Sequence, residues 1–585
     1  DVDAGMKEAQ VTVDHVYKTP VETHTPIELH ASLAVYADGK YTLYETTQAV
    51  VNFRDVMAAT LGVPVENVQV ITKFLGSGFG GKLWPWPQAA LAAACARNLK
   101  RPVKLVVSRQ MTFESAGHRP ETEQRVRMGA AADGALTAIA HDYVNHTSML
   151  DNYAENCGEA TPFLYSTKNL MVTAGMTRRN VGTPTSMRGP GAVPGLFALE
   201  SAMDELAIAL KMDPVALRLK NEPAIDESNG LPFSSRHLSE CLQTGAAKFG
   251  WSKRTPEVGS MKRDGVTLGW GTAACTWFAG RTDGEAQVEI RDDGTARLAC
   301  ATQDIGGGTY TVIAQMVSEE TGIPVEKVQV VLGDSRLPPG PISGGSLATA
   351  SVIPAALAAA QDAKKDLLRV ASQSEDGPFK GMKPTDLEMA AGMVRVKATG
   401  AGMPVGEVLQ RAKVKAVYGE GHSVGTLGGG KAEWSFHSYG AQFAEVTWQP
   451  EIARLRVSRI VTVIDGGRMI NPRTARNQIE GALVMGVGMA MLEETIYDKR
   501  TGKPVNNNLA DYIVSTNADA PEMDVTFLDY PDYKLNALGA RGIGEIGLAG
   551  VAAAITSAVY HATGVRVRDL PVKIEDVIGP AMKVA

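Results

Sequence analysis

Two matching stretches decide how this chain folds: Leu61-Gly-Val-Pro-Val-Glu-Asn-Val-Gln-Val-Ile71 and Thr321-Gly-Ile-Pro-Val-Glu-Lys-Val-Gln-Val-Val331. They are separated by 321 − 61 = 260 residues. A β-type segment and a Thr-Gln pair lie ahead of each copy, followed by a stretch with helical periodicity, Arg54 to Thr60 or Thr309 to Thr321. A repeated unit of strand, loop, helix and strand predicts two related halves.

A glycine-rich turn follows each copy. It reads Gly76-Ser-Gly-Phe-Gly-Gly-Lys82 in the first half, and Gly333-Asp-Ser followed by Gly344-Gly-Ser346 in the second. Because equivalent loops of two related halves can face each other, we expect them to hold a ligand between them. The predicted fold is α+β, with one lobe over residues 1–255 and a second, related lobe over residues 256–585.

Composition excludes several functional classes. The 58 Lys and Arg against 64 Asp and Glu give a net charge of −6 with no long run of one sign, so nucleic acid and anionic membranes are poor partners. The five cysteines form no C-x-x-C pattern, and the ten histidines include no H-E-x-x-H. We therefore expect neither an iron–sulfur cluster nor a zinc site, and any transition metal is expected to arrive inside a cofactor.

No apolar run is long enough to span a bilayer and no cleavable signal is visible, which leaves cytoplasm and periplasm both open. The chain opens at Asp1, so an upstream segment is expected to have been removed or encoded separately.

Several other segments are interpreted as scaffold. Apolar periodicity predicts helices, and alternation predicts a strand, while polar and glycine-rich stretches predict surface connections. The predicted helices are Leu196 to Leu210, Pro214 to Leu219 and Asn477 to Met491; the strand is Arg454 to Ile464; the connections are Ser372 to Thr385 and Gly425 to Lys431. The glycines in the third helix predict close packing, most simply against another helix.

Gly76 to Lys82 fits two phosphate-binding patterns that fail on their context. A P-loop requires a hydroxyl residue after its lysine, and here Leu83 follows. A dinucleotide-binding turn is followed by an acid about twenty residues on, and none is present. The remaining interpretation is a nest of backbone N–H groups and a bare glycine surface for an anionic or oxo-bearing group, with Phe79 against it.

Two further loops are candidates for binding. Gln303-Asp-Ile-Gly-Gly-Gly-Thr309 lies between a strand and a helix whose first N–H groups can receive phosphate. Arg188-Gly-Pro-Gly191 places a guanidinium beside glycines, where it can hold a carboxylate, a phosphate or an oxyanion. A tight turn and an ordinary ion pair are the respective alternatives.

Glu545 lies in Gly542-Ile-Gly-Glu-Ile-Gly547, ahead of the small-residue run Ala549 to Ala558. Flanking glycines allow close approach of a ligand, and a helix start favours the ionised form of an acid placed there. We interpret Glu545 as a catalytic base beside a bulky ligand. The alternative is an acid that only satisfies free N–H groups in the first helical turn.

Taken together, these motifs resemble the molybdenum-cofactor subunit of the xanthine oxidase and aldehyde oxidase family. They are G-S-G-F-G-G-K, R-G-P-G, T-Q-D-I-G-G-G-T, L-G-D-S-R-L-P-P-G-P-I-S-G-G-S and G-I-G-E-I-G-L, in this order. The resemblance covers essentially the whole chain and is nearest to the bacterial three-subunit aldehyde oxidases.

The resemblance implies a molybdenum held by a pterin dithiolene, and Glu545 as the general base that takes a proton from a metal-bound hydroxide as it attacks the substrate carbon. It further implies Arg188 as an active-site arginine and Arg281 as a second one. The implied cofactor-binding residues are Gly78, Phe79, Gly80, Gln303, Asp304, Ile305, Gly306, Gly307, Gly308, Thr309, Gly344, Gly345, Ser346, Thr349, Ser351, Gly542 and Gly544.

Departures from the family pattern narrow the substrate. Purine-oxidising members carry an acid after the lysine of G-G-K, whereas Leu83 and Trp84 give an apolar wall that suits an aldehyde. The carbon monoxide dehydrogenase branch needs a cysteine near Arg188, which is absent. Gly307 stands where several members carry a glutamine, so one hydrogen bond to an oxo group is not expected.

The resemblance therefore implies oxidation of aldehydes to carboxylic acids, with water as the oxygen source. The implied cofactor is molybdenum-molybdopterin in its cytosine dinucleotide form, with a 2Fe-2S cluster and FAD carried on partner subunits. Hydroxylation of an aromatic N-heterocycle by the same centre is an alternative, and a cofactor-free assembly subunit is another. The particular aldehyde and the electron acceptor stay open.

Overall fold

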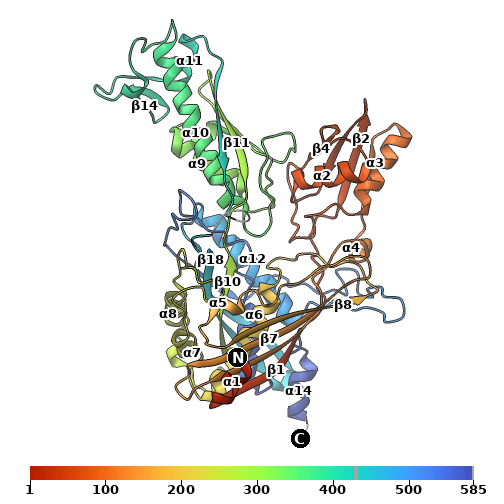
Figure 1. Cartoon of the computed structure of the whole chain (residues 1–585). Helices are drawn as coiled ribbons and strands as arrows, with labels where there is room; N and C mark the ends of the chain where they lie inside the picture. Colours follow the sequence, from red (N-terminus) through yellow and green to blue (C-terminus); the bar gives the residue numbers. More distant parts are fainter. Residues whose placement is uncertain (427–431, 583–585) are drawn as a thin grey trace.

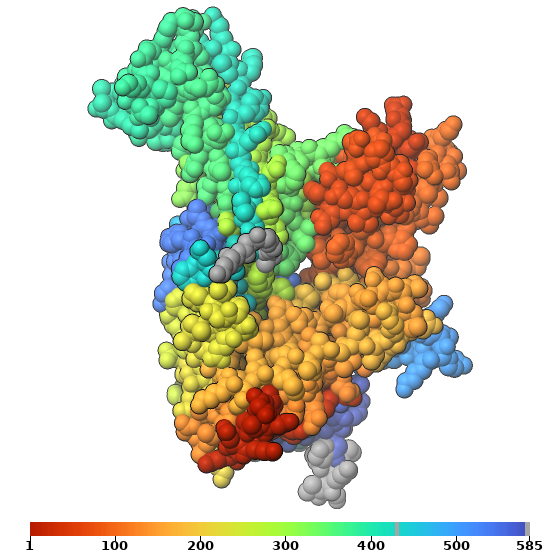
Figure 2. Space-filling view, in the orientation of Figure 1, coloured from red at the N-terminus to blue at the C-terminus, as the bar shows by residue number. Residues whose placement is uncertain are grey.

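The computed structural model describes residues 1–426 and 432–582, so most of the predicted Gly425 to Lys431 connection lies outside the described residues. Two smaller sheets with their helices stand apart above a base built from two larger sheets (Figure 1). The space-filling view shows a notch between these two projections (Figure 2). No helix in the described ranges is long and apolar enough to cross a bilayer.

The two smaller sheets are copies of one design. The first has the order β4-β3-β2-β5, with bounds Val68–Ile71, Lys40–Glu45, Ala31–Ala37 and Val103–Val106. The second has the order β13-β12-β11-β17, with bounds Val328–Val331, Ala296–Ala299, Gly284–Arg291 and Ala416–Ser423. In each sheet the first pair is parallel and the other pairs are antiparallel. The matching sequence stretches thus end in equivalent strands, β4 and β13.

Helices cover each small sheet in the same way. Helices α2 (Val50–Leu61) and α3 (Pro87–Leu99) pack on the first, and α9 (Thr309–Thr321) and α10 (Ala348–Gln373) pack on the second. A small sheet of β14 (Leu387–Ala390), β15 (Met393–Val396) and β16 (Gly402–Pro404), with α11 (Val405–Arg411), is inserted between α10 and β17.

The larger sheets repeat a second design. One has the order β1-β6-β7-β8, with bounds Val11–Thr19, Thr122–Ala130, Leu136–Ser148 and Leu170–Arg179. The other has the order β20-β19-β18-β10-β9, with bounds Glu522–Leu528, Arg454–Asp465, His437–Gln449, Val266–Phe278 and Met261–Arg263. The β7–β8 and β19–β20 pairs are parallel, and the neighbouring pairs are antiparallel. The duplication therefore extends well beyond the stretch where the sequence reveals it.

Two helices fill the centre of the base. The almost completely buried α6 (Ala192–Leu210) packs on β1 and β6, while α13 (Val551–Thr563) packs on β10 and β18 and also contacts α6. Gly269 and Gly271 of β10 permit this, because a Cβ at these positions would lie 1.9 and 2.2 Å from carbonyl oxygens of α13. The close contact fixes the start of α13 and the loop that precedes it.

The remaining helices surround these layers. They are α1 (Val2–Glu8), α4 (Arg109–Ser115), α5 (Thr161–Leu164), α7 (Pro214–Lys220), α8 (Leu238–Phe249), α12 (Pro472–Met491) and α14 (Ile574–Met582). The helices predicted at 196–210, 214–219 and 477–491 and the strand predicted at 454–464 are confirmed as α6, α7, α12 and β19.

The segment after β13 joins the two halves by crossing to the first small sheet. The Thr72 amide donates to the Gly333 carbonyl at 2.7 Å, and the Gln69 side chain donates to Asp334 at 2.9 Å. Gly333 has a φ of +73°, and a Cβ there would lie 1.8 Å from the Thr72 carbonyl oxygen. The matching position in the first repeat, 333 − 260 = 73, is Lys73, so the two copies differ at this junction.

Candidate active site

A cavity of about 650 Å³ lies between the two halves and is lined by both. The first half contributes the Ser77 to Gly80 loop, Leu83 and Trp84, and the Ser186 to Arg188 segment. The second half contributes residues of the Ile305 to Thr309 loop, the Ile342 to Thr349 segment and Gly542 to Glu545. The expectation that equivalent glycine loops face one shared space is confirmed by this lining.

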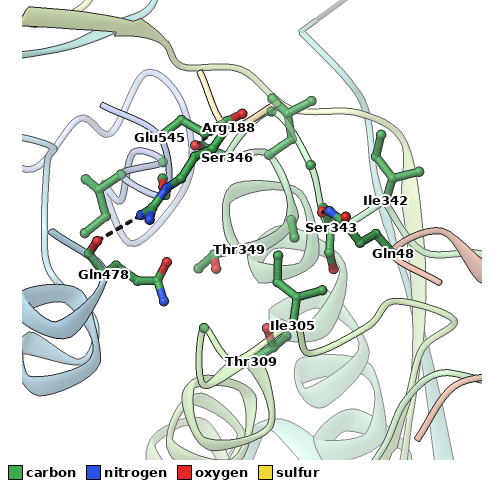
Figure 3. A pocket seen from close by; sticks show the side chains of 18 of the residues that line it. Gln48, Arg188, Ile305, Thr309, Ile342, Ser343, Ser346, Thr349, Gln478 and Glu545 are labelled. Atoms are coloured by element: carbon green, nitrogen blue, oxygen red, sulfur yellow. Dashed lines mark hydrogen bonds between the residues drawn. The ribbon is translucent and has the colours of Figure 1, made fainter. Parts of the chain in front are cut away.

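Glu545 lies at one side of the cavity, together with Arg188 and Ser346 (Figure 3). Its carboxylate accepts hydrogen bonds from the Gly189 amide at 3.2 Å and from the Ser346 hydroxyl at 2.8 Å. One donor belongs to each half of the chain, so the two halves must be in contact for this geometry to exist.

The loop around Glu545 does not take part in a helix start, contrary to the sequence-based expectation. Helix α13 begins only at Val551, with Gly550 as its N-cap, and turns occupy the residues between. Burial is the dominant influence on Glu545 and raises its pKa above the ordinary value. The Ser346 hydroxyl, the Gly189 amide and the charge of Arg188 act in the opposite direction.

The glycines beside Glu545 are required by the Ser346 turn. A Cβ on Gly542 would lie 2.0 Å from the Ser346 carbonyl oxygen, and one on Gly544 would lie 3.3 Å from its hydroxyl. Ser346 itself has a φ of +60°, which is strained for a residue with a side chain. Close packing of these two loops aims the Ser346 hydroxyl at the carboxylate.

Arg188 connects three parts of the wall. Its Nε donates to the Gly544 carbonyl at 2.7 Å, and its Nη2 donates to the Gln478 carbonyl at 2.9 Å (Figure 3). Burial lowers the pKa of Arg188 to about 10, partly opposed by Glu545, so the guanidinium is still charged at neutral pH. Two of its donors thus hold the backbone rather than an anion.

Two amides of the Gly76 to Lys82 loop and two of its glycines are used in contacts within the protein. The Gly80 and Lys82 amides donate to the side-chain oxygen of Gln48 at 3.0 and 3.3 Å. A Cβ on Gly78 would lie 2.3 Å from that oxygen, and one on Gly80 would lie 2.0 Å from the Ser186 carbonyl oxygen. The predicted nest is therefore wrong in these positions, because an internal acceptor already occupies its N–H groups.

Lys82 attaches the same loop to Glu28. Its ammonium group is fully buried and donates to the Glu28 carboxylate at 2.8 Å and to the Glu28 carbonyl at 3.0 Å. Glu28 also accepts from the Gly76 amide at 2.9 Å. The lysine fixes the shape of the loop and does not point to a phosphate.

The start of α9 is likewise occupied by the chain itself. The Asp304 carboxylate accepts from the amides of Gly306, Gly308 and Tyr310 at 2.9, 3.2 and 3.3 Å. Asp304 therefore supplies negative charge near the helix N-terminus, and the expectation that N–H groups here receive a phosphate is wrong for these three amides.

Most of the site residues expected from the sequence line the cavity. These are Gly78, Phe79, Gly80, Leu83, Trp84, Arg188, Ile305, Gly307, Thr309, Gly344, Gly345, Ser346, Thr349, Gly542, Gly544 and Glu545. The residues that the structure does not bring to the lining are Gln303, Asp304, Gly306, Gly308, Ser351 and Arg281. Ser351 is buried in α10, where its hydroxyl donates to the Leu347 carbonyl, and Arg281 lies on the loop after β10.

One polar wall of the cavity, near the start of α12, was not predicted from the sequence. Arg468, Asn471, Thr474, Asn477 and Gln478, at the start of α12, all line the cavity. The signal was Asn471-Pro472, an N-cap followed by proline at the first helical position, which marks a helix start. Gln48 was also missed, although its Thr47-Gln48 pair repeats as Thr302-Gln303.

Fold and site together define a cofactor-binding protein whose cavity lies between duplicated halves. Two profiles described as molybdopterin cofactor-binding domain match residues 1–222 and 244–521. The chain therefore belongs to the xanthine oxidase and aldehyde oxidase family of molybdenum enzymes.

Relatives and solved structures agree with this placement. The chain is 37% identical to the aldehyde oxidoreductase molybdenum-binding subunit PaoC of Escherichia coli O157:H7, over 99% of this chain and 77% of the relative. It is 29% identical to the xanthine dehydrogenase molybdenum-binding subunit of the same organism, over 96% and 76%. The crystal structure of quinoline 2-oxidoreductase from Pseudomonas putida 86 superposes with a TM-score of 0.87 at 21% identity, over 100% of this chain and 78% of that one.

The cavity fits a molybdopterin cofactor on its own geometry. Gly307 and Gly481 line it, and a Cβ on either residue would meet no protein atom within 4 Å. Neither glycine has a positive φ, so neither protein packing nor backbone strain requires them. Their missing side chains leave room inside a cavity that also presents the polar wall at the start of α12.

Proposed function

We propose that this chain is the molybdenum-binding subunit of an enzyme that oxidises aldehydes to carboxylic acids, with water as the oxygen source and Glu545 as general base. Residues 1–255 and 256–585 are its two cofactor-binding lobes. The proposal is carried by one observation: the Glu545 carboxylate lines the cavity and accepts a hydrogen bond from each half, from the Gly189 amide and from the Ser346 hydroxyl.

Glu545 is suited to accept a proton. Among the described residues, each of its carboxylate oxygens accepts one hydrogen bond, which leaves lone pairs free toward the cavity. Because burial raises its pKa above the ordinary value, the carboxylate is a better base than an exposed glutamate. When bound, the molybdenum cofactor supplies the two-electron acceptor for the oxidation.

Arg188 supports the proposed base, and the apolar wall favours one class of substrate. Arg188 keeps a positive charge beside Glu545 and favours the ionised carboxylate that a base requires. Phe79, Leu83 and Trp84 line the cavity and present apolar surface without acceptors for a purine ring. This wall favours an aldehyde with an aromatic or aliphatic substituent.

Replacement of the base tests the proposal. Glu545→Gln is expected to keep the fold and the molybdenum content. It should lower kcat/KM for benzaldehyde by roughly 10²- to 10⁴-fold, because the amide cannot accept the proton. The matched control is Glu45→Gln, a buried carboxyl of strand β3 that does not line the cavity and should leave turnover unchanged. Near-normal turnover of molybdenum-loaded Glu545→Gln would contradict the assignment.

A substrate comparison tests the class. Benzaldehyde is expected to react faster than nicotinate, because the apolar surface of Phe79, Leu83 and Trp84 favours a neutral substrate over one that carries a carboxylate. A preference for nicotinate would replace aldehyde oxidation with heterocycle hydroxylation by the same centre.

We further propose the cytosine dinucleotide form of the cofactor and partner subunits that carry a 2Fe-2S cluster and FAD. The polar wall of Asn471, Thr474, Asn477 and Gln478 supports a cofactor with a polar tail, and the relatives named as molybdenum-binding subunits support an assembly. Quantification of molybdenum, iron, flavin and released nucleotide on the purified complex tests each element separately. A matured complex without molybdenum would instead favour an assembly subunit.

A further inference from the structure

One peptide group separates the carboxylate of Glu545 from a buried cation. The peptide between Arg188 and Gly189 donates its N–H to Glu545 Oε1 at 3.2 Å, and its carbonyl oxygen accepts from Arg119 Nη2 at 2.7 Å. The carbonyl and N–H of a trans peptide point in opposite directions, so Arg119 and Glu545 lie on opposite sides of this group. We propose that Arg119 is a positioning residue for Glu545 that acts through the Arg188–Gly189 peptide; its catalytic meaning rests on the proposed function.

The surroundings of Arg119 fix its guanidinium in this place. The side chain is fully buried, and it donates to Glu22 at 2.9 Å and to Glu155 at 3.4 Å. A cation on the carbonyl oxygen polarises the peptide, which makes the N–H at its other end a stronger donor. Arg119 therefore strengthens the hydrogen bond that favours the ionised form of Glu545.

Glu155 holds the same loop at a second point. Its carboxylate accepts from the Gly191 amide at 2.6 Å and from the Tyr153 hydroxyl at 2.8 Å. Gly191 has a φ of +74°, and a Cβ there would lie 2.4 Å from the Asn156 carbonyl oxygen. The loop backbone is thus attached at residues 188 and 191 and has no room to move away from Glu545.

The charged groups around Glu545 predict how its pKa changes when Arg119 is removed. Arg188 and Arg119 both lower its pKa, against the larger contribution of burial. On the facing segment, burial followed by the charges of Glu545 and Glu155 raises the pKa of Glu159 to about 7. Removal of Arg119 leaves the carboxylates without one of two opposing cations, so the pKa of Glu545 should rise.

A second buried ion pair offers a matched control. Arg218 and Glu200 are both fully buried and lie 2.8 Å apart, linking α7 to α6. The hydrogen bonds of Arg218 go to Glu200 and Pro214, and none reaches the Arg188 loop. Replacing Arg218 therefore disturbs an equally buried pair without touching the peptide that carries the proposal.

The test is an infrared titration of the Glu545 carboxyl band in the cofactor-free chain, with the band assigned through Glu545→Gln. In Arg119→Met the midpoint is expected to rise by about one pH unit, a tenfold change in proton affinity. Arg119→Lys, which keeps the charge, should shift it less, and Arg218→Met should leave it unchanged. An unshifted midpoint in Arg119→Met, or an equal shift in Arg218→Met, would overturn the proposal.

Glu155→Gln should shift the infrared midpoint of Glu545 in the direction opposite to Arg119→Met. This second variant keeps the proposal testable if Arg119→Met does not fold. The amide oxygen can still accept from Gly191, while the loss of negative charge leaves Arg119 less neutralised. The midpoint of Glu545 should therefore fall, and a rise or no change would contradict the proposal.

The assembled, cofactor-loaded enzyme separates this inference from the proposed function. If Glu545 is the base, the acidic limb of the kcat/KM profile moves in the same direction as the infrared midpoint in each variant. If the infrared midpoint shifts and the acidic limb of the kcat/KM profile does not move, Glu545 is not the base. The infrared midpoints alone decide the role of Arg119.

Discussion

Glu545 is one of several carboxyl groups that burial makes less acidic. Burial raises the pKa of Glu45, whose carboxylate accepts from the Ser32 hydroxyl, to about 8, and burial raises that of Glu493 to about 8 as well. What distinguishes Glu545 is its position: it faces a cavity and accepts hydrogen bonds from residues 356 and 199 positions away. A raised pKa alone does not identify a catalytic residue in this chain.

Glu45 should make stability depend on pH. Its folded pKa of about 8 lies above the value of 4.5 that applies in the unfolded chain, so the folded state holds the proton more tightly. The contribution of Glu45 to stability is therefore fully present below the unfolded pKa and is lost as pH rises toward 8, by up to about 1.4 kcal/mol for each pH unit crossed. Glu45→Gln, which is neutral throughout, should flatten this decline, as followed by denaturant unfolding between pH 5 and 9.

Glu45→Gln should match the native chain near pH 5 and exceed it at pH 9. The comparison with Glu388→Gln, a replacement on the exposed side of strand β14, controls for a general effect of one lost charge. An unchanged slope in Glu45→Gln would show that the buried carboxyl finds a compensating partner.

At the scale of the element, the glycines of α12 have two different roles. Gly486 allows α12 to approach α13, because a Cβ there would lie 2.5 Å from Val551. Gly481 meets no protein atom and lines the cavity. The expected helix contact is confirmed for Gly486, whereas Gly481 leaves space in the cavity.

Substitutions at these two glycines should therefore have opposite effects. Gly481→Ala is expected to stabilise the cofactor-free chain by about 0.5–1 kcal/mol, because alanine has the higher helix propensity. Gly486→Ala should destabilise it by about 1–3 kcal/mol through overpacking. Thermal unfolding of the two cofactor-free variants measures both values.

Gly481→Leu extends the test to the cavity. Its side chain has room only where the cofactor is expected, so purified protein should contain less molybdenum without loss of secondary structure. Full molybdenum content in Gly481→Leu would place the cofactor elsewhere.

At the scale of the whole molecule, the crossing segment at Gly333 holds the halves together. Gly333→Ala combines a φ of +73° with a Cβ that would lie 1.8 Å from the Thr72 carbonyl oxygen. Gly62→Ala has a φ of +65° and meets nothing within 4 Å. The control should lose about 1 kcal/mol of stability from backbone strain, and Gly333→Ala about 3 kcal/mol or more.

Because Gln48 and Ser343 bond across the same boundary, Gly333→Ala should also weaken cofactor retention, measured as molybdenum content after dialysis. Equal losses in both variants would indicate that the junction contributes only its local strain.

Much of this architecture was predictable from the sequence, since repeats, apolar periodicity and cap residues act locally. The duplicated stretch predicted two halves, and residues such as Glu545 and Arg188 were placed in the cavity correctly. The roles of the glycine loops were not predictable, because Gln48, Ser186 and Asp304 fill them with acceptors whose positions depend on tertiary contacts. The sequence does not distinguish a glycine that leaves space for a ligand from a glycine that leaves space for another loop.

The two donors that hold Glu545 leave the ribosome long before it does, since Gly189 and Ser346 precede it by 356 and 199 residues. A nascent chain thus exposes residues of the cavity wall from both halves before Glu545, the proposed base, has been synthesised. A truncated product ending before residue 545 carries most of the lining and lacks this carboxylate, so the order of translation delays completion of the cavity wall until residue 545 has emerged.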